Sequence, residues 1–140
     1  MSQALLAGLA RTNRPQTAVR RVLALDAVVT GANGIAYAVA SGPLGELLGV
    51  DPGLLLGLGL FLTAFAAGVA LLATRPQPPA TAVKLVVDAN VLWAVLSVVA
   101  LFAWLEPTTA GLFWTPVQAL TVAGFAALQW IALRAVAAGR

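Results

Sequence analysis

The chain contains neither cysteine nor histidine, and these two absences remove most of the chemistry that proteins use at catalytic and metal sites. Without cysteine there is no disulfide, no thiolate nucleophile and no sulfur ligand for a metal ion. Without histidine the chain lacks the commonest metal ligand and the usual general base near neutral pH. We therefore expect a protein that is not an enzyme, with no catalytic residue, no metal site and no cofactor.

Charged residues are also scarce, at 9% of the 140 residues, whereas hydrophobic residues make up 61% and the mean hydropathy is +0.94. A soluble domain carries about a quarter charged residues. The formal net charge is +3, but none of the eight basic residues lies in the interior of the four long apolar stretches. Basic residues at the ends of apolar stretches orient a protein in a membrane and contact anionic lipid. We therefore expect the lipid bilayer as a partner and no nucleic acid.

The four apolar stretches cover residues 22–41, 54–74, 85–105 and 116–134. A helix of about 20 residues is long enough to cross a hydrocarbon core of about 30 Å. Basic residues precede the first stretch, separate the second from the third and follow the fourth, whereas the other two gaps hold only Glu46, Asp51 and Glu106 as charged residues. The positive-inside rule then predicts cytoplasmic termini. Residues 1–140 form one transmembrane domain in this interpretation, with residues 1–21 as a cytoplasmic N-terminal segment.

Two short motifs are typical of helix starts. Asp51-Pro52 combines an N-cap with proline at the first helical position. Thr115-Pro116 has the same order, and Gln118 completes a pattern that resembles a capping box. We therefore expect helices to begin at Pro52 and at Pro116.

A shift of 64 residues aligns the chain partly with itself. Residues 15–20 then fall on residues 79–84, Pro43 on Pro107, and Pro52 on Pro116. We interpret this as a tandem duplication of a helical hairpin, with units of about 15–75 and 79–139. The predicted fold is all-α, an antiparallel four-helix transmembrane bundle, with 43–50 and 107–114 as equivalent short outer elements.

Polar residues recur at helical spacing within three of the stretches. Because a helix turns about 100° per residue, residues that are three or four positions apart share one face. Lipid does not satisfy polar side chains, so these faces are expected to turn inward as a ladder. Asp26, Asn90 and Gln129 fall at a similar inner depth, whereas Asn33, Ser97 and Thr121 fall near the middle. Aromatic residues near the outer ends are Tyr37, Trp104 and Trp114, and Trp130 lies near the inner end.

Two interpretations of the ladder remain open. Its residues either hydrogen-bond between helices and hold the bundle together, or line a cavity that binds a small molecule or passes an ion or proton. A carboxyl group inside a span is costly, so Asp26 is the candidate for a titrating group. The candidate ligand- or ion-binding residues are Asp26, Asn33, Tyr37, Asn90, Trp93, Gln118 and Gln129.

The runs at residues 26–37, 42–49, 90–93 and 104–114, together with Gln118, resemble a group of small four-span integral membrane proteins of high-GC bacteria. The resemblance covers roughly residues 20–134 and implies a bacterial cytoplasmic membrane. In helix number and in the glycine-rich loop after the first span, the chain is more distantly similar to DoxX-like four-helix membrane proteins. Some of those associate with quinone or redox partners, but the similarity transfers no catalytic residue.

Function is predicted less sharply than fold. The leading expectation is a non-enzymatic structural or accessory membrane protein that works through another membrane protein or as a homo-oligomer. The alternative is a small-molecule or ion binder or transporter that uses the polar ladder around Asp26. A membrane enzyme or a quinone-handling subunit is the third possibility.

Overall fold

The computed structural model describes residues 14–103 and 106–138, which form five helices and contain no strand. The helices are α2 (Arg14–Val39), α3 (Ser41–Leu48), α4 (Pro52–Ala73), α5 (Ala80–Ala103) and α6 (Thr109–Ala138). All except the short α3 are long and apolar enough to cross a membrane. The chain is therefore a helical, multi-pass membrane protein, as its composition predicted.

The helices are longer than the apolar stretches alone. The predicted start at Pro116 is wrong, because α6 begins at Thr109 and contains this proline in its interior. The predicted start at Pro52 is confirmed, since the Asp51 carboxylate accepts a hydrogen bond of 3.0 Å from the Leu54 amide and caps α4. Residues 14–21, assigned to a separate N-terminal segment, are the first turns of α2. Predictions for residues 1–13, Trp104 and Arg140 lie outside the described residues.

The two outer segments differ from each other. The first is a separate helix, α3, which ends at Gly49 in a left-handed conformation with φ of 74°. The second, from Thr109 onward, is continuous with α6. In the 64-residue alignment Phe113 takes the place of Gly49, and a bulky residue disfavours the left-handed conformation that ends a helix. The expectation of two equivalent short elements is therefore wrong for the second segment.

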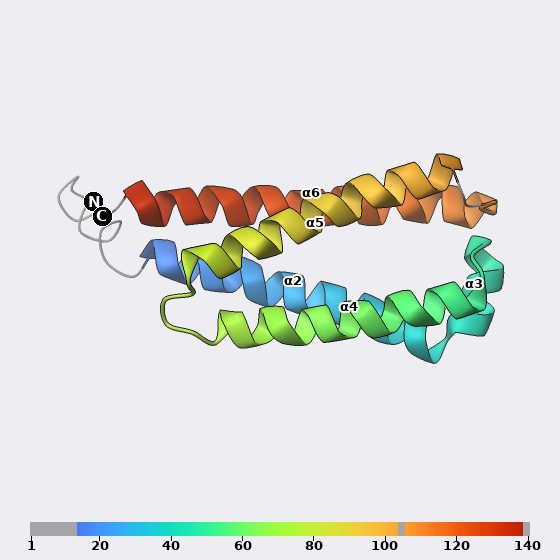
Figure 1. The fold of residues 1–140 in the computed structure, drawn as a ribbon, viewed down its shortest axis with the longest axis horizontal. Coiled ribbons are helices and arrows are strands. Elements are labelled where there is room, and N and C mark those ends of the chain that lie inside the picture. Colours follow the sequence, from blue (N-terminus) through green and yellow to red (C-terminus); the bar gives the residue numbers. More distant parts are fainter. Residues whose placement is uncertain (1–13, 104–105, 139–140) are drawn as a thin grey trace, which may run out of the picture.

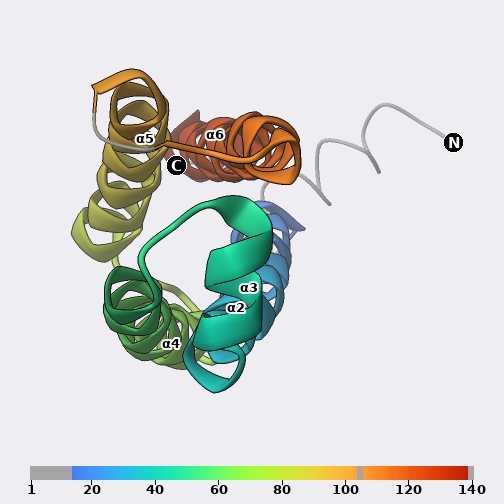
Figure 2. The ribbon, with the colours of Figure 1, turned by 90° about the vertical axis from the view of Figure 1, so that its right-hand side faces the viewer.

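The four long helices lie side by side along the long axis of the molecule, and α3 lies across one end (Figure 1). Seen end-on, α2 lies between α4 and α6, and α5 lies next to α6 (Figure 2). Contact is most extensive between α2 and α4, followed by α5 with α6, whereas α4 and α5 make little contact with each other. The bundle is therefore closed on one side and loosely packed on the other.

Two apolar clusters fill the bundle. One lies toward the start of α2 and the end of α6 and includes Val19, Leu23, Val83 and Leu133. The other lies beneath α3 and includes Tyr37, Leu48, Leu55 and Leu62. Large apolar side chains elsewhere point outward, as expected for helices that face lipid: Ile35, Phe61, Leu71, Phe102 and Leu120 are more than half exposed. Polar residues lie between the two clusters.

Candidate functional site

Asp26 of α2 is at the centre of the polar residues. Its Oδ1 accepts a hydrogen bond from the Thr30 hydroxyl at 2.7 Å. Its Oδ2 accepts two more, from Asn90 Nδ2 at 2.8 Å and from Gln129 Nε2 at 2.7 Å. Asn90 Nδ2 also donates to Gln129 Oε1 at 3.0 Å. We call these four residues the Asp26 network, and it connects α2, α5 and α6.

The positions of these residues follow from helical geometry. Asp26 and Thr30 are four residues apart, so one turn of α2 brings the hydroxyl to the carboxylate. Asn90 continues the face of α5 that buries Val83, Val86 and Val87. Gln129 continues the buried face of α6. The structure thus brings together the three residues that sequence placed at a common inner depth.

The centre of the Asp26 network, formed by Asp26 and Gln129, is enclosed by protein. Asp26 and Gln129 are 0% exposed, Asn90 is 4% exposed and Thr30 is 8% exposed. No buried side-chain nitrogen or oxygen atom among residues 14–103 and 106–138 lacks a hydrogen-bond partner. Both carboxylate oxygens of Asp26 are already used by protein donors. The site therefore offers a ligand little access to the carboxylate.

The partners of Asp26 are neutral hydroxyl and amide groups. The two nearest basic side chains on α2 do not pair with Asp26. Arg20 donates from Nε to the Ala73 carbonyl at 3.1 Å, and Arg21 is exposed. Three donors from neutral groups compensate for part of the loss of water around a buried carboxyl group. If one of these donors is removed, the Asp26 carboxyl group loses a hydrogen bond. Neither water nor lipid supplies another donor at this buried position.

Three further candidate residues, Tyr37, Trp93 and Gln118, lie in two separate hydrogen-bonded pairs nearer the outer end. Trp93 Nε1 donates to Gln118 Oε1 at 2.8 Å and joins α5 to α6. Trp114 Nε1 donates to the Tyr37 hydroxyl at 2.6 Å and joins α6 to α2. The predicted ladder is therefore divided into the inner network and two outer pairs.

The middle level of the predicted ladder does not exist as a connected group. Ser97 and Thr121 donate to backbone carbonyls of their own helices, those of Trp93 and Val117. Asn33 is half-buried, and its amide has no hydrogen-bond partner among the described residues. It lines a cavity of about 460 Å³ between α2, α3 and α6, together with Tyr37 and Trp114. We call this the Asn33 cavity.

Sequence reasoning missed the aromatic residues of α4. Phe61 stacks on Phe65 at 6.2 Å between ring centroids and on Trp93 of α5 at 6.1 Å. These rings and the side chains of Thr30 and Asn90 line a cavity of about 240 Å³ beside the Asp26 network. The four-residue spacing of the two phenylalanines, which places both rings on one face of α4, was the available signal.

The site consists of fixed hydrogen bonds and aromatic contacts within a multi-pass helical membrane protein. The described part of the chain contains no group of acidic side chains arranged to hold a metal ion. No protein-family model, curated protein or solved structure matches the chain. Inference about function therefore depends on the site alone.

Proposed function

We propose that this chain is a non-enzymatic structural or accessory protein of the bacterial cytoplasmic membrane, working through another membrane protein or as a homo-oligomer. In this proposal the Asp26 network holds the spans together rather than binding a substrate. The observation that carries the proposal is the closure of the network, because Asp26 is 0% exposed and both its oxygens accept hydrogen bonds from protein donors.

The proposal includes an antiparallel bundle made from two duplicated hairpins. Asp26 and Asn90 are 64 residues apart, the period of the sequence alignment, and they are hydrogen-bonded at 2.8 Å. Val19 and Val83 are separated by the same interval and are both buried in one apolar cluster. Contact between corresponding residues is expected close to a pseudo-twofold axis along the membrane normal. These contacts support the duplication.

A structural role also agrees with the energetics of polar groups in membranes. Interhelical hydrogen bonds contribute about 0.6 kcal/mol on average, because polar groups find other partners when the helices separate. A carboxyl group with three protein donors is a stronger case, since hydrogen bonds to charged groups are worth about 1.5–3 kcal/mol. The network therefore favours one arrangement of α2, α5 and α6.

The first test compares Asp26→Leu with Asp26→Asn. The leucine variant leaves the amides of Asn90 and Gln129 without their shared acceptor, so we expect the free energy of unfolding to fall by about 1–3 kcal/mol. The asparagine variant retains an acceptor oxygen of similar shape and is expected to lose less. Thermal unfolding in mild detergent, followed by circular dichroism, measures both.

Native mass spectrometry of protein extracted gently from its own membrane then tests the function. We expect this chain to leave the membrane attached to another protein or to a second copy, with the same partner in Asp26→Asn. A small molecule that binds the wild-type chain reproducibly and is lost in Asp26→Asn, at unchanged stability, would contradict the structural role.

The Asn33 cavity favours a second candidate, the binding of a small amphipathic molecule. An amide without a partner inside a span is unusual, because unpaired polar groups are costly there. The Asn33 amide, the Tyr37 hydroxyl and the Trp114 ring together suit a ligand with one polar group and an apolar body. In the same mass measurement this candidate predicts a bound molecule that is lost in Asn33→Leu and kept in Asp26→Asn.

A further inference from the structure

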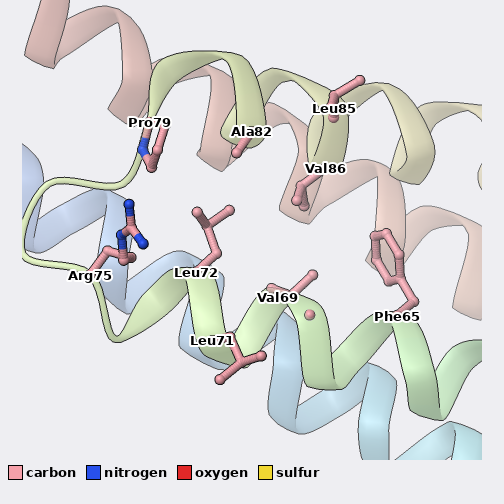
Figure 3. A pocket seen from close by; sticks show the side chains of 10 residues that line it. Phe65, Val69, Leu71, Leu72, Arg75, Pro79, Ala82, Leu85 and Val86 are labelled. Carbon is pink, nitrogen blue, oxygen red and sulfur yellow. The ribbon is translucent and has the colours of Figure 1, made fainter.

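A further hollow, separate from the two cavities described above, lies between α4 and α5, on the loosely packed side of the bundle. It has a volume of about 520 Å³, and its lining includes Phe65, Val69, Leu72, Arg75, Ala82 and Val86. Figure 3 shows Leu72, Val69 and Phe65 of α4 directed toward Ala82 and Val86 of α5, with Arg75 at the loop end of the hollow. We call this hollow the α4–α5 crevice.

The crevice exists because the two helices pack against other partners. α4 packs along α2, and α5 packs along α6, whereas α4 and α5 make little contact with each other. The bulky ring of Phe65 is half-buried at the inner wall. Except for Arg75, every side chain named in the lining is apolar, so the crevice is open to molecules that are dissolved in the membrane.

Arg75 gives the crevice a charge at one end. It follows α4, which ends at Ala73. Basic residues next to the end of a transmembrane helix are typical of the cytoplasmic headgroup region, so we place its side chain there. It is exposed and has no hydrogen bond or ion pair with the described residues, in contrast to Arg20, which bonds to the Ala73 carbonyl. A free guanidinium group forms bidentate hydrogen bonds with phosphate.

We propose that the α4–α5 crevice binds an anionic phospholipid, with the phosphate on Arg75 and one acyl chain along Leu72, Val69 and Phe65. Basic pockets between transmembrane helices are known to bind acidic lipid headgroups. The proposal goes beyond the structural role of the Asp26 network and does not depend on it.

The size of the crevice argues against a partner helix as its occupant. From Phe65 to Arg75 it runs about 15 Å along α4, at about 1.5 Å per residue. A helix about 10 Å across would need roughly 1,200 Å³ over that length. Even with the space open to its surroundings included, the crevice holds about 930 Å³, which is less than a helix needs and suits a narrow, flexible acyl chain better.

The test uses the full chain, stripped of lipid in detergent and titrated with phosphatidylglycerol or with phosphatidylcholine of identical acyl chains. Native mass spectrometry measures the fraction of protein with one bound lipid. We expect phosphatidylglycerol to bind more tightly than phosphatidylcholine. In Arg75→Gln we expect the ratio of the two affinities to fall by about fivefold, the contribution of one basic residue near an acidic headgroup. Arg21→Gln is the matched control, because Arg21 is also exposed but does not line the crevice.

A second variant tests the place of the acyl chain. Gly68 lines the crevice, and a Cβ atom added there meets no atom within 4 Å, so Gly68→Leu starts a side chain in open space and occupies part of the crevice. We expect it to weaken the binding of both lipids. Gly57→Leu is its control, since Gly57 on the same helix is equally open and lies outside the crevice lining.

Four outcomes would overturn the proposal. Equal binding of the two lipids would remove the role of the headgroup charge, and an unchanged preference in Arg75→Gln would remove the role of this residue. Binding of glycerol phosphate as tight as that of the whole lipid, or unaltered lipid binding in Gly68→Leu, would mean that the crevice takes no acyl chain. None of these results bears on the role of Asp26.

Discussion

Asp26 shows how much of a membrane protein depends on a few polar atoms. A single oxygen, Oδ2, accepts hydrogen bonds from α5 and α6, and the two donors also bond to each other. Groups that share an acceptor do not act independently, because removing one changes what the other contributes. The strength of the Asp26 network is therefore a property of the group.

A double-mutant cycle measures this dependence. We expect the losses of unfolding free energy in Asn90→Leu and Gln129→Leu to be non-additive, with a coupling energy of about 0.5–3 kcal/mol. Gln118→Leu combined with Gln129→Leu is the control, because Gln118 bonds to Trp93 and Thr115 and shares no partner with Gln129. That pair is expected to be additive within about 0.5 kcal/mol in detergent unfolding. Additive losses for Asn90 and Gln129 would contradict a cooperative network.

The sequence predicted these residues only in part, and the reason is geometric. Helical periodicity gives the face and the depth of a residue, which is enough to place Asp26, Asn90 and Gln129 at one level. It does not say which faces meet, nor whether a hydroxyl finds a carbonyl on its own helix, as Thr121 does. Asn33 has the same predicted depth as Ser97 and Thr121. These two residues bond to their own helices, whereas Asn33 lines the Asn33 cavity.

At the level of secondary structure, the outer end is held by backbone contacts. Thr108 donates from its backbone N–H to the Leu48 carbonyl at 3.3 Å, and its hydroxyl donates to the Leu47 carbonyl. These bonds satisfy carbonyl groups at the end of α3 that have no partner within the helix. The end of α3 and the start of α6 approach each other closely, and this requires a small residue in each segment. Gly49 and Gly111 are these residues.

Gly111 and Gly124, both in α6, make a matched test of this contact. A Cβ atom at Gly111 would lie 2.1 Å from the Leu48 carbonyl oxygen, whereas one at Gly124 meets nothing within 4 Å. We expect Gly111→Ala to lower the unfolding free energy by about 1–3 kcal/mol through displaced backbone. Gly124→Ala is expected to raise it by about 0.5–1 kcal/mol through better helix propensity. Equal effects of the two changes in thermal unfolding would contradict the close contact.

The helices themselves were predictable, but their ends were predictable only where a side chain determined them. Asp51 caps α4 as expected because its carboxylate reaches the Leu54 amide. The similar motif at Thr115-Pro116 fails, because Phe113 stands where the first half has the helix-ending Gly49 and the chain continues through the proline. Proline is tolerated inside transmembrane helices when nearby groups take over backbone hydrogen bonding. Pro116 lacks the N–H that would bond to the Leu112 carbonyl, and α6 continues in spite of this loss.

For the whole molecule, the main feature is unequal packing around the bundle. In the proposed duplication α2 corresponds to α5 and α4 to α6, so the α2–α6 contact corresponds to α4–α5. The first of these is extensive and the second is slight. In the 64-residue alignment Phe65 takes the place of Gln129, so a bulky ring stands where the other half has a hydrogen-bonding amide. This difference agrees with the slight contact between α4 and α5, where the crevice lies.

The absence of cysteine makes the proposed orientation directly testable. Glu46 in α3 and Gln77 in the α4–α5 loop are both exposed, and single cysteines at these positions would be the only thiols in the chain. We expect a membrane-impermeant maleimide to label Glu46→Cys on intact cells and Gln77→Cys only after lysis. The unmodified chain is the control for background labelling. Labelling of Gln77→Cys on intact cells would reverse the proposed orientation.

The long sequence distances within the Asp26 network also affect the order of events during synthesis. Asp26 is 64 residues from Asn90 and 103 residues from Gln129, so α2 is made well before its partners. At the centre of a helix an aspartate adds about 2.5–3.5 kcal/mol to the free energy of insertion. α2 is also less apolar than α4, with a mean hydropathy of 1.6 against 2.3. During synthesis the Asp26 carboxyl group therefore has only Thr30 of its own helix as a donor, and its Oδ2 gains its partners only when α5 and α6 have been made.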